Sequence, residues 1–204
     1  MDARLLHAAE AAIGFMPAAE GLALYRAALE APRAGPMVEV GSYCGKSAIY
    51  LGAAAQETGS VLFTVDHHRG SEENQPGQPY HDPRLVDEAG RVDTLPHLRA
   101  TIAGAQLEEV VVLVVGRSEV VAREWRAPLA LLFIDGGHSQ PAVDADYDGW
   151  TPHLTAGGLL AIHDVFPNPA DGGRPPFVVY RRALVEGGFE EIAAEGSLRI
   201  LRRR

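Results

Sequence analysis

The chain has 204 residues, of which 47% are hydrophobic and 22% charged, and its formal net charge at pH 7 is −9. This length and composition fit one globular domain, 1–204, with a substantial core. The acidic balance argues against nucleic acid as the main partner, because phosphate contacts need a basic footprint. The one basic cluster, Arg202-Arg203-Arg204, is expected to be a solvated tail.

The single cysteine, Cys44, excludes an internal disulfide and suits a reducing compartment. The sequence shows neither a signal peptide nor an apolar run of membrane-spanning length. We therefore expect a cytoplasmic protein with no membrane partner. The oligomeric state is left open, and a homodimer is compatible with the sequence.

The predicted elements alternate between helices and strands. Residues 1–33 are expected to form leading helices, broken at Gly14 and Pro17. Five apolar runs then predict strands at 37–41, 61–66, 110–116, 129–136 and 158–164. Continuous rather than alternating apolar residues indicate burial on both faces, which is typical of a parallel sheet. Residues 189–196 and 197–203 read as a closing antiparallel hairpin. The fold class is therefore α/β, a doubly wound Rossmann-like sheet that is mostly parallel.

A glycine-punctuated turn follows the first strand, in the segment VEVGSYCGKSA that starts at Val38. Such a turn between strand and helix is where a doubly wound domain meets a nucleotide-like cofactor, and its free N–H groups favour anions. The dinucleotide fingerprint G-x-G-x-x-G is not met, because Tyr43 stands where its middle glycine belongs. Glu39, two residues before Gly41, is also foreign to that fingerprint.

Ionisable side chains follow the next strands where ligands bind in such a sheet, at the carboxyl ends. Asp66 follows the second strand and can accept the ribose hydroxyls, or it can cap a turn. Asp135 follows the fourth strand and His163-Asp164 the fifth. Adjacent strand ends lie about 5 Å apart, so these three residues can converge. Buried charges must be paired or bind metal, so we expect a divalent metal site; the alternative is a metal-free site in which His163 hydrogen-bonds Asp135.

The segment Glu39-x-Gly41-x-Tyr43-Cys44-Gly45-x-Ser47 resembles motif I of class I S-adenosyl-L-methionine (SAM) methyltransferases, especially the catechol O-methyltransferase branch. The resemblance spans roughly 37–165 and implies a seven-stranded sheet whose last strand is antiparallel. It also implies that Ser47 touches the methionine carboxylate and that Ser118, in Gly116-x-Ser118, lies beside the adenine or caps the following helix. The cofactor-binding residues it implies are Glu39, Gly41, Tyr43, Gly45, Ser47, Asp66, His67, Gly116, Ser118 and Asp135.

The catechol-type family holds Mg²⁺ with an acid after strand four and an acid-amide pair after strand five. The matching positions make Asp135, His163 and Asp164 the implied metal ligands. Mg²⁺ is expected first, although an imidazole shifts the preference toward Mn²⁺, Fe²⁺ or Zn²⁺. His138 stands where the family carries a general-base lysine, and a mostly neutral imidazole can accept a hydroxyl proton. The catalytic candidates are therefore His138 and Asp135. His138 can also be a metal ligand, or an N-cap or surface residue before a helix near Pro141.

Two long segments flank the expected site. Residues 67–93 lack sustained apolar periodicity, and we expect a substrate lid or a solvated loop there. Its specificity candidates are His67, His68, Arg69 and His81. Residues 165–177 are rich in proline and glycine and are expected to form a second wall of the pocket.

The sequence thus predicts a SAM-dependent O-methyltransferase, assisted by a divalent metal, that acts on a small hydroxylated molecule. The Ile134-Asp135-Gly136-Gly137-His138 strand end resembles bacterial sugar and natural-product enzymes. Three rivals are kept. A nicotinamide-dependent oxidoreductase is disfavoured by Tyr43 and the terminal hairpin. A histidine-rich metallohydrolase leaves the Gly41–Gly45 loop without a purpose. A catalytically silent SAM-binding subunit would show the same sequence features.

Overall fold

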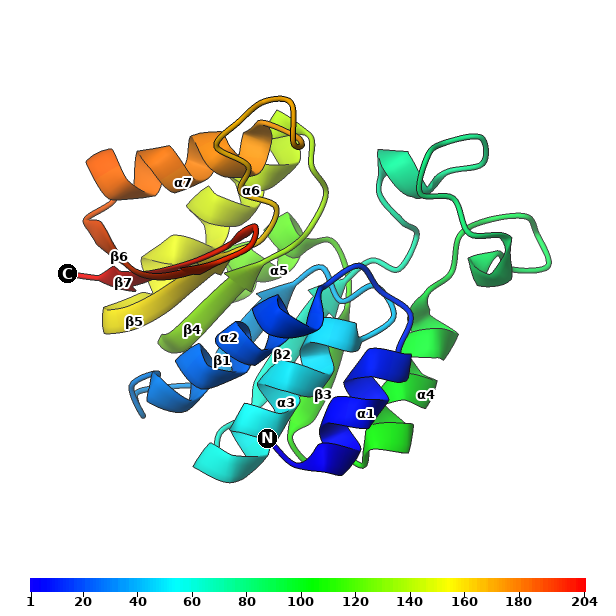
Figure 1. The fold of residues 1–204 in the computed structure, drawn as a ribbon, viewed down its shortest axis with the longest axis horizontal. Coiled ribbons are helices and arrows are strands. Elements are labelled where there is room, and N and C mark those ends of the chain that lie inside the picture. Colours follow the sequence, from blue (N-terminus) through cyan, green and yellow to red (C-terminus); the bar gives the residue numbers. More distant parts are fainter.

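A seven-stranded sheet forms the centre of the computed structural model, which describes residues 1–204 (Figure 1). Its order is β3-β2-β1-β4-β5-β7-β6. Strands β1 to β5 run parallel, and β7 is antiparallel to both β5 and β6. The expected mostly parallel sheet with an antiparallel closing hairpin is confirmed. The strands are β1 Met37–Val40, β2 Leu62–Asp66, β3 Val111–Val115, β4 Leu129–Ile134, β5 Leu154–Ile162, β6 Phe189–Glu195 and β7 Leu198–Arg203.

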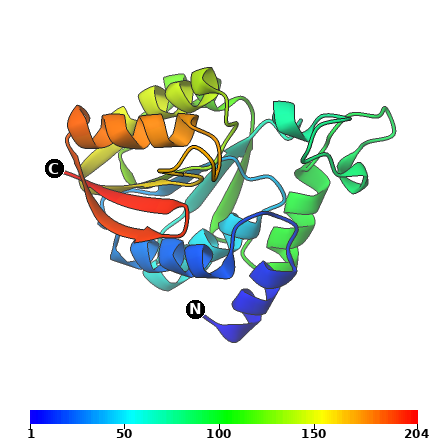
Figure 2. The same ribbon diagram turned by 45° about the horizontal axis from the view of Figure 1, so that its top comes forward.

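Helices cover both faces of the sheet (Figures 1 and 2). One hydrophobic core joins α1–α4 to one face, and a second joins α5–α7 to the other. Strand β4 serves both, because Phe133 points into the first core and Leu132 into the second. The helices are α1 Ala3–Ala11, α2 Ala18–Glu30, α3 Lys46–Thr58, α4 Leu95–Ala105, α5 Ser118–Glu124, α6 Gln140–Trp150 and α7 Pro175–Val185; short 3₁₀ turns are η1 Glu72–Asn74, η2 Pro83–Leu85 and η3 Thr151–His153. No helix is both long and apolar enough to span a bilayer.

Three details differ from the sequence-based expectations. Strand β3 lies at the sheet edge, so its Val112 and Val115 are exposed rather than buried. Strand β5 begins at Leu154, ahead of its apolar run, because a register irregularity next to β4 lets half-exposed residues join the strand. The C-terminal arginines are not simply a solvated tail: the Arg203 guanidinium donates to the carbonyls of Thr151 and Leu154.

The turn after β1 brings two backbones together at the carboxyl edge of the sheet. Gly41 has φ +93°, a left-handed conformation that glycine tolerates best. A Cβ atom at Gly41 would lie 2.1 Å from the carbonyl oxygen of Asp135, so no side chain fits there. Gly45, at φ +92°, is the N-cap of α3 and turns the chain into that helix. The glycine motif therefore sets the close approach of the β1 and β4 ends.

We expect Gly41→Ala to lower the free energy of unfolding by about 3 kcal/mol or more, because it combines left-handed strain with a backbone clash. Gly59→Ala is the matched control, since Gly59 has φ +67° but a Cβ there meets no atom within 4 Å. Its cost should stay near 1 kcal/mol. Urea midpoints of both variants test this, and equal costs would contradict the close-approach argument.

Candidate functional site

The predicted site residues gather along one edge of the sheet. The Gly41–Gly45 turn follows β1, Asp66 ends β2, Gly116 follows β3, Asp135 follows β4, and His163 follows β5. Because these five strands are parallel and adjacent, their carboxyl ends form a continuous row. The expected convergence is seen directly at the β4 and β5 ends, where His163 Nδ1 lies 2.9 Å from Asp135 Oδ1.

Asp66 ties the glycine turn to the start of the long loop. Its carboxylate accepts the Tyr43 backbone N–H at 2.9 Å and the His68 backbone N–H at 2.7 Å. Tyr43 and His68 both have positive φ values, so these bonds hold two strained turns. The capping role is thus present, and the ribose role of Asp66 stays a prediction. Gly116 lies next to it, with its N–H donating to the Asp66 carbonyl.

Glu39 is a completely buried carboxyl group beneath the glycine turn. The Thr64 hydroxyl donates to its Oε2, whereas its Oε1 has no hydrogen-bond partner. Burial raises the pKa of Glu39 to about 7, and the hydroxyls of Ser47 and Thr64 partly oppose that shift. Ser47, the second residue of α3, is itself buried. An unpaired buried carboxylate oxygen is uncommon in native proteins and offers an acceptor to a bound ligand.

His163 is held between two carboxylates. Its Nδ1 lies 2.9 Å from Asp135 Oδ1, and its Nε2 lies 2.6 Å from Oε2 of Glu20 on α2. Burial opposes the charged imidazole, but the carboxylates of Asp135, Asp164 and Glu20 outweigh it and raise the pKa of His163 far above its ordinary value. The hydrogen-bonding alternative for His163 is therefore observed. His163 is only 5% exposed and Glu20 holds its Nε2 in the interior, so its expected role as a metal ligand is not what this geometry favours.

Glu20 was not among the sequence candidates. Its carboxylate also accepts the Ser197 backbone N–H at 2.9 Å and its hydroxyl at 3.2 Å. The pKa of Glu20 is lowered: burial works against ionisation, and the hydrogen bonds from His163 and Ser197 overcome it. A signal existed in the sequence, because Glu20 lies one turn before Leu24 and on the same buried stripe of α2. An acid on the apolar face of a helix needs a buried partner.

His138 connects the β5 end to the long loop. Its Nε2 lies 3.0 Å from Asp164 Oδ2, and its Nδ1 lies 3.1 Å from Oε2 of Glu73 in η1. Asp164 raises the pKa of His138 to about 9, with burial opposing and Glu73 and Asp135 assisting. The expectation of a mostly neutral imidazole is therefore not met in the metal-free protein. His138 is not an N-cap either, since Ser139 occupies that position of α6.

The residues that can hold a metal ion are Asp135, His138 and Asp164. One ligand atom from each lies within 4.8 Å of the other two. Two carboxylates and one imidazole are a donor set suited to Mg²⁺, Mn²⁺ or Zn²⁺, so the residues present fit a divalent ion. This set keeps two of the three expected ligands and replaces His163 by His138.

Ser118 lies at the far end of the row. It is the first residue of α5, whose N-cap is Arg117, so its expected capping role is not seen. Its hydroxyl oxygen instead accepts the indole N–H of Trp150 at 2.8 Å. The place beside a bound adenine remains a prediction for Ser118.

The long loop, residues 67–93, projects from the carboxyl edge (Figures 1 and 2). Its Tyr80 packs edge-on against Phe15, which in turn lies 5.5 Å from the Tyr43 ring. Three of the expected specificity candidates make bonds within the loop or at its base. Arg69 pairs with Asp87, His81 with the Asn74 carbonyl, and buried His68 with Thr94. His67 alone among the loop histidines is exposed at the start of the loop, where its Nδ1 accepts the Arg69 N–H.

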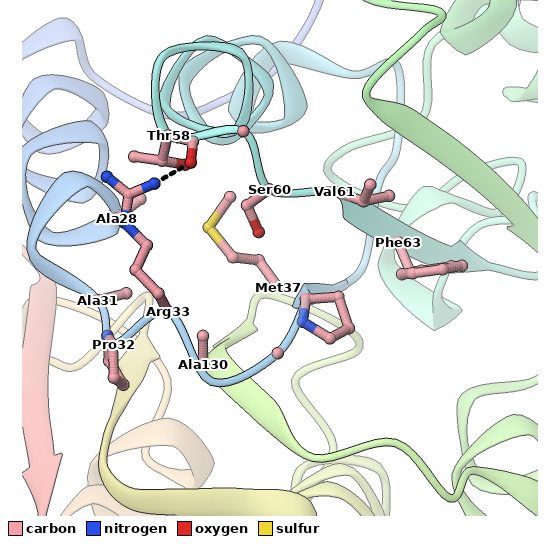
Figure 3. Close-up of a pocket in the computed structure, with 13 residues that line it drawn as sticks. Ala28, Ala31, Pro32, Arg33, Met37, Thr58, Ser60, Val61, Phe63 and Ala130 are labelled. Carbon is pink, nitrogen blue, oxygen red and sulfur yellow. Dashed lines mark hydrogen bonds between the residues drawn. The ribbon is translucent and has the colours of Figure 1, made fainter.

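A separate pocket opens at the opposite edge of the sheet (Figure 3). It is lined by the amino ends of β1 and β2 and the end of α3, including Met37, Val61 and Ser60. Arg33 is its only ionisable side chain, and its guanidinium is occupied by the Thr58 carbonyl. This pocket lacks the convergent acids and imidazoles that the carboxyl edge offers.

Comparison with known proteins identifies a family whose model covers the strands that carry the candidate site. A family model described as a methyltransferase domain matches residues 38–165. The O-methyltransferase TomG from Streptomyces achromogenes, solved with SAM, shares 16% identity at a TM-score of 0.66 over 100% of this chain and 90% of its own. The SAH-bound methyltransferase PaMTH1 of Podospora anserina shares 14% at 0.69 over 100% and 89%. The O-methyltransferase NovP shares 18% at 0.67 over 90% and 79%. The class I methyltransferase fold is confirmed.

The raised pKa of His138 predicts a pH dependence of stability in the metal-free protein. A group whose pKa is higher folded than unfolded stabilises fully below its unfolded value, near 6.5, and loses that contribution as pH rises through its folded value. With chelator present, the free energy of unfolding should therefore fall between pH 6.5 and about 9. His138→Gln should flatten this slope, and the exposed control His7→Gln should not. Identical slopes in urea titrations of all three proteins would rule this out.

Proposed function

Because this chain belongs to the methyltransferase family whose model its residues 38–165 match, we propose that it is a SAM-dependent O-methyltransferase acting on a small hydroxylated molecule. The observation that carries the proposal is the meeting of Asp135, His138 and Asp164 beside the Gly41–Gly45 turn. A sugar or natural-product acceptor is favoured by the similar structures, which include the TDP-rhamnose 3'-O-methyltransferase CalS11 and TomG, an enzyme involved in tomaymycin synthesis.

Bound SAM would supply a methyl group on a positively charged sulfur. The chain's own residues suit each end of such a ligand. The N-terminus of α3 and the Ser47 hydroxyl favour a carboxylate. The unpaired Oε1 of Glu39 lies beneath the same turn, closed off from solvent, so an ammonium group would reach it once the turn shifts. Asp66 holds the turn on which Tyr43 stands and faces the same edge, where a carboxylate accepts ribose hydroxyls. The suitability of these groups for the carboxylate, ammonium and ribose of SAM supports SAM as the cofactor.

Asp135, His138 and Asp164 would hold a divalent ion, which lowers the pKa of a coordinated hydroxyl. Because Glu73 occupies Nδ1, His138 has only Nε2, the nitrogen that now faces Asp164, for either of its two roles. As the third metal ligand it cannot also take the hydroxyl proton, and as the base it leaves the ion to Asp135 and Asp164. It can act as the base only when neutral, and the two neighbouring carboxylates oppose that state. Neutralising the charge of Asp135 and Asp164 therefore favours the base role of His138. Glu73 holds the opposite nitrogen, which fixes the ring orientation.

The loop 67–93 is proposed as the substrate lid. Two contacts bring it over the site: Glu73 to His138, and Tyr80 to Phe15. The Glu73–His138 contact is polar and the Tyr80–Phe15 contact is apolar, and together they hold the loop against the carboxyl edge of the sheet. A closed lid excludes water, which strengthens the electrostatic interactions of the acids and imidazoles beneath it.

Cofactor binding is tested first, by calorimetry with S-adenosylhomocysteine. The wild-type protein should bind it, and Asp66→Ala should weaken binding by about 1–3 kcal/mol through loss of a charged acceptor. Glu109→Ala, which removes an acid just before β3 and away from the carboxyl edge, is the control and should leave the affinity unchanged. No binding to the wild-type protein would defeat the proposed function; unchanged affinity in Asp66→Ala would remove only Asp66.

The metal ligands are tested with Mn²⁺ as a paramagnetic probe. Asp164→Ala should abolish specific Mn²⁺ binding, since it removes a carboxylate from a three-residue donor set. His138→Gln should weaken binding strongly, whereas His163→Gln should largely retain it because His163 is buried against Glu20 and stands outside the three-residue donor set. The reverse order for the two histidines would restore His163 as the ligand. Mn²⁺ binding that survives Asp164→Ala would remove Asp164 from the site, and no specific Mn²⁺ binding by the wild-type protein would end the metal proposal.

A further inference from the structure

Asp146 is a buried carboxylate that the proposed chemistry does not use. It lies on α6, is only 6% exposed, and takes part in no ion pair. Burial raises its pKa to about 6, and the Ser118 hydroxyl partly opposes the shift. A buried carboxylate that lacks a cation needs hydrogen-bond donors.

The Asp146 carboxylate lies against the edge that holds the site. A Cβ atom at Gly136, in the turn after β4, would lie 2.8 Å from Asp146 Oδ2. On its other side is Ser118, at the end of β3. The Asp146 carboxylate thus lies behind the row of strand ends, between the turns after β3 and β4.

The hydrogen bonds around Ser118 leave Asp146 in need of a donor. The Trp150 indole N–H can only donate, so Ser118 Oγ is the acceptor of that bond. Ser118 then has one hydroxyl proton to offer, and the carboxylate has two oxygens to satisfy. The other acid nearby, Glu119, is half-exposed and paired with Arg117 at 2.7 Å. Asp146 is therefore the acceptor that remains for a ligand at this end of the row.

The two ends of the row differ in polarity. The β4 and β5 ends carry the charged array of Asp135, His163 and Asp164, whereas the β3 end carries Ser118 next to exposed Val115. If the ribose of a nucleoside binds at Asp66 on β2, its neutral, flat base fits best at the end of β3, which carries fewer charges than the β4 and β5 ends. This step rests on the proposed function, because it takes a SAM-type nucleoside as the ligand.

From this geometry we propose that Asp146 accepts a hydrogen bond from the 6-amino group of the adenine and so determines the base specificity of the site. An adenine presents its 6-amino group as a donor, whereas a 6-oxo purine presents an acceptor at the same place. The ionised carboxylate disfavours the second, because two acceptors then face each other unless the carboxyl group takes up a proton.

The test compares S-adenosylhomocysteine with S-inosylhomocysteine, its 6-oxo analogue, by calorimetry at one pH. The wild-type protein should prefer the adenosine compound by roughly 10-fold or more. Asp146→Asn should reduce that preference to about threefold or less, because an amide can accept from the amine or donate to the oxo group. Asp144→Asn is the matched control on the same helix, where Asp144 faces Arg182 near the surface, and it should keep the wild-type preference.

Equal wild-type affinity for the two compounds overturns the proposal, whether or not any variant folds. An unchanged preference in Asp146→Asn also overturns it. Should that variant not fold, Asp146→Ser, which leaves space for a water molecule, takes its place with the same expected loss of preference. A wild-type protein that binds neither compound refutes the proposed function itself, which separates that failure from a failure of Asp146 alone.

Discussion

The hydrogen-bonded line from Glu20 through His163 to Asp135 is the interaction on which the arrangement of this edge depends. It joins α2, the β5 end and the β4 end, and through Ser197 it also fixes the turn of the closing hairpin. Glu20 and His163 are almost fully buried, so neither can lose its partner without leaving a charge in a low-dielectric interior. The helix that precedes the sheet thus determines where a carboxylate of the site points.

This line also decides which histidine is available for chemistry. Two histidines lie near Asp164, and each has a carboxylate at both ring nitrogens. Only His163 is almost fully buried. His163 therefore has a structural role. His138 is partly exposed and can contact a ligand, and its second partner, Glu73, comes from the loop 67–93. Because η1 carries Glu73, the state of the loop and the state of the His138 imidazole are coupled. A loop that moved away would remove one of the carboxylates that hold the ring charged.

The sequence was sufficient for features that depend on local pattern. Five apolar runs predicted β1 to β5, and the glycine-containing turn between 189–196 and 197–203 predicted the hairpin of β6 and β7. Gly41 and Gly45 marked the turn after β1, because a left-handed backbone and a close approach demand glycine. Features that depend on contacts between distant segments were missed. Glu20 lies 143 residues before His163, and Glu73 lies 65 residues before His138. The sequence left His138 open as a base or a metal ligand, and the burial of His163 against Glu20, a contact between distant segments, is what favours His138 as the candidate ligand.

Charge is graded along the row of strand ends, and this grading orients a ligand. Four carboxylates and two imidazoles stand at the β4 and β5 ends, counting Glu20 and Glu73. Toward β3 there are fewer charged groups: the exposed Arg117–Glu119 pair, the Ser118 hydroxyl and the buried carboxyl group of Asp146. This grading suits the proposed ligand in one direction, with its cationic sulfur toward the carboxylates and its uncharged ring toward β3, because a ring among the charged groups would strip them of solvent. In that direction the sulfur would lie toward Asp135 and Asp164, the acids that hold His138 charged until a bound cation neutralises them.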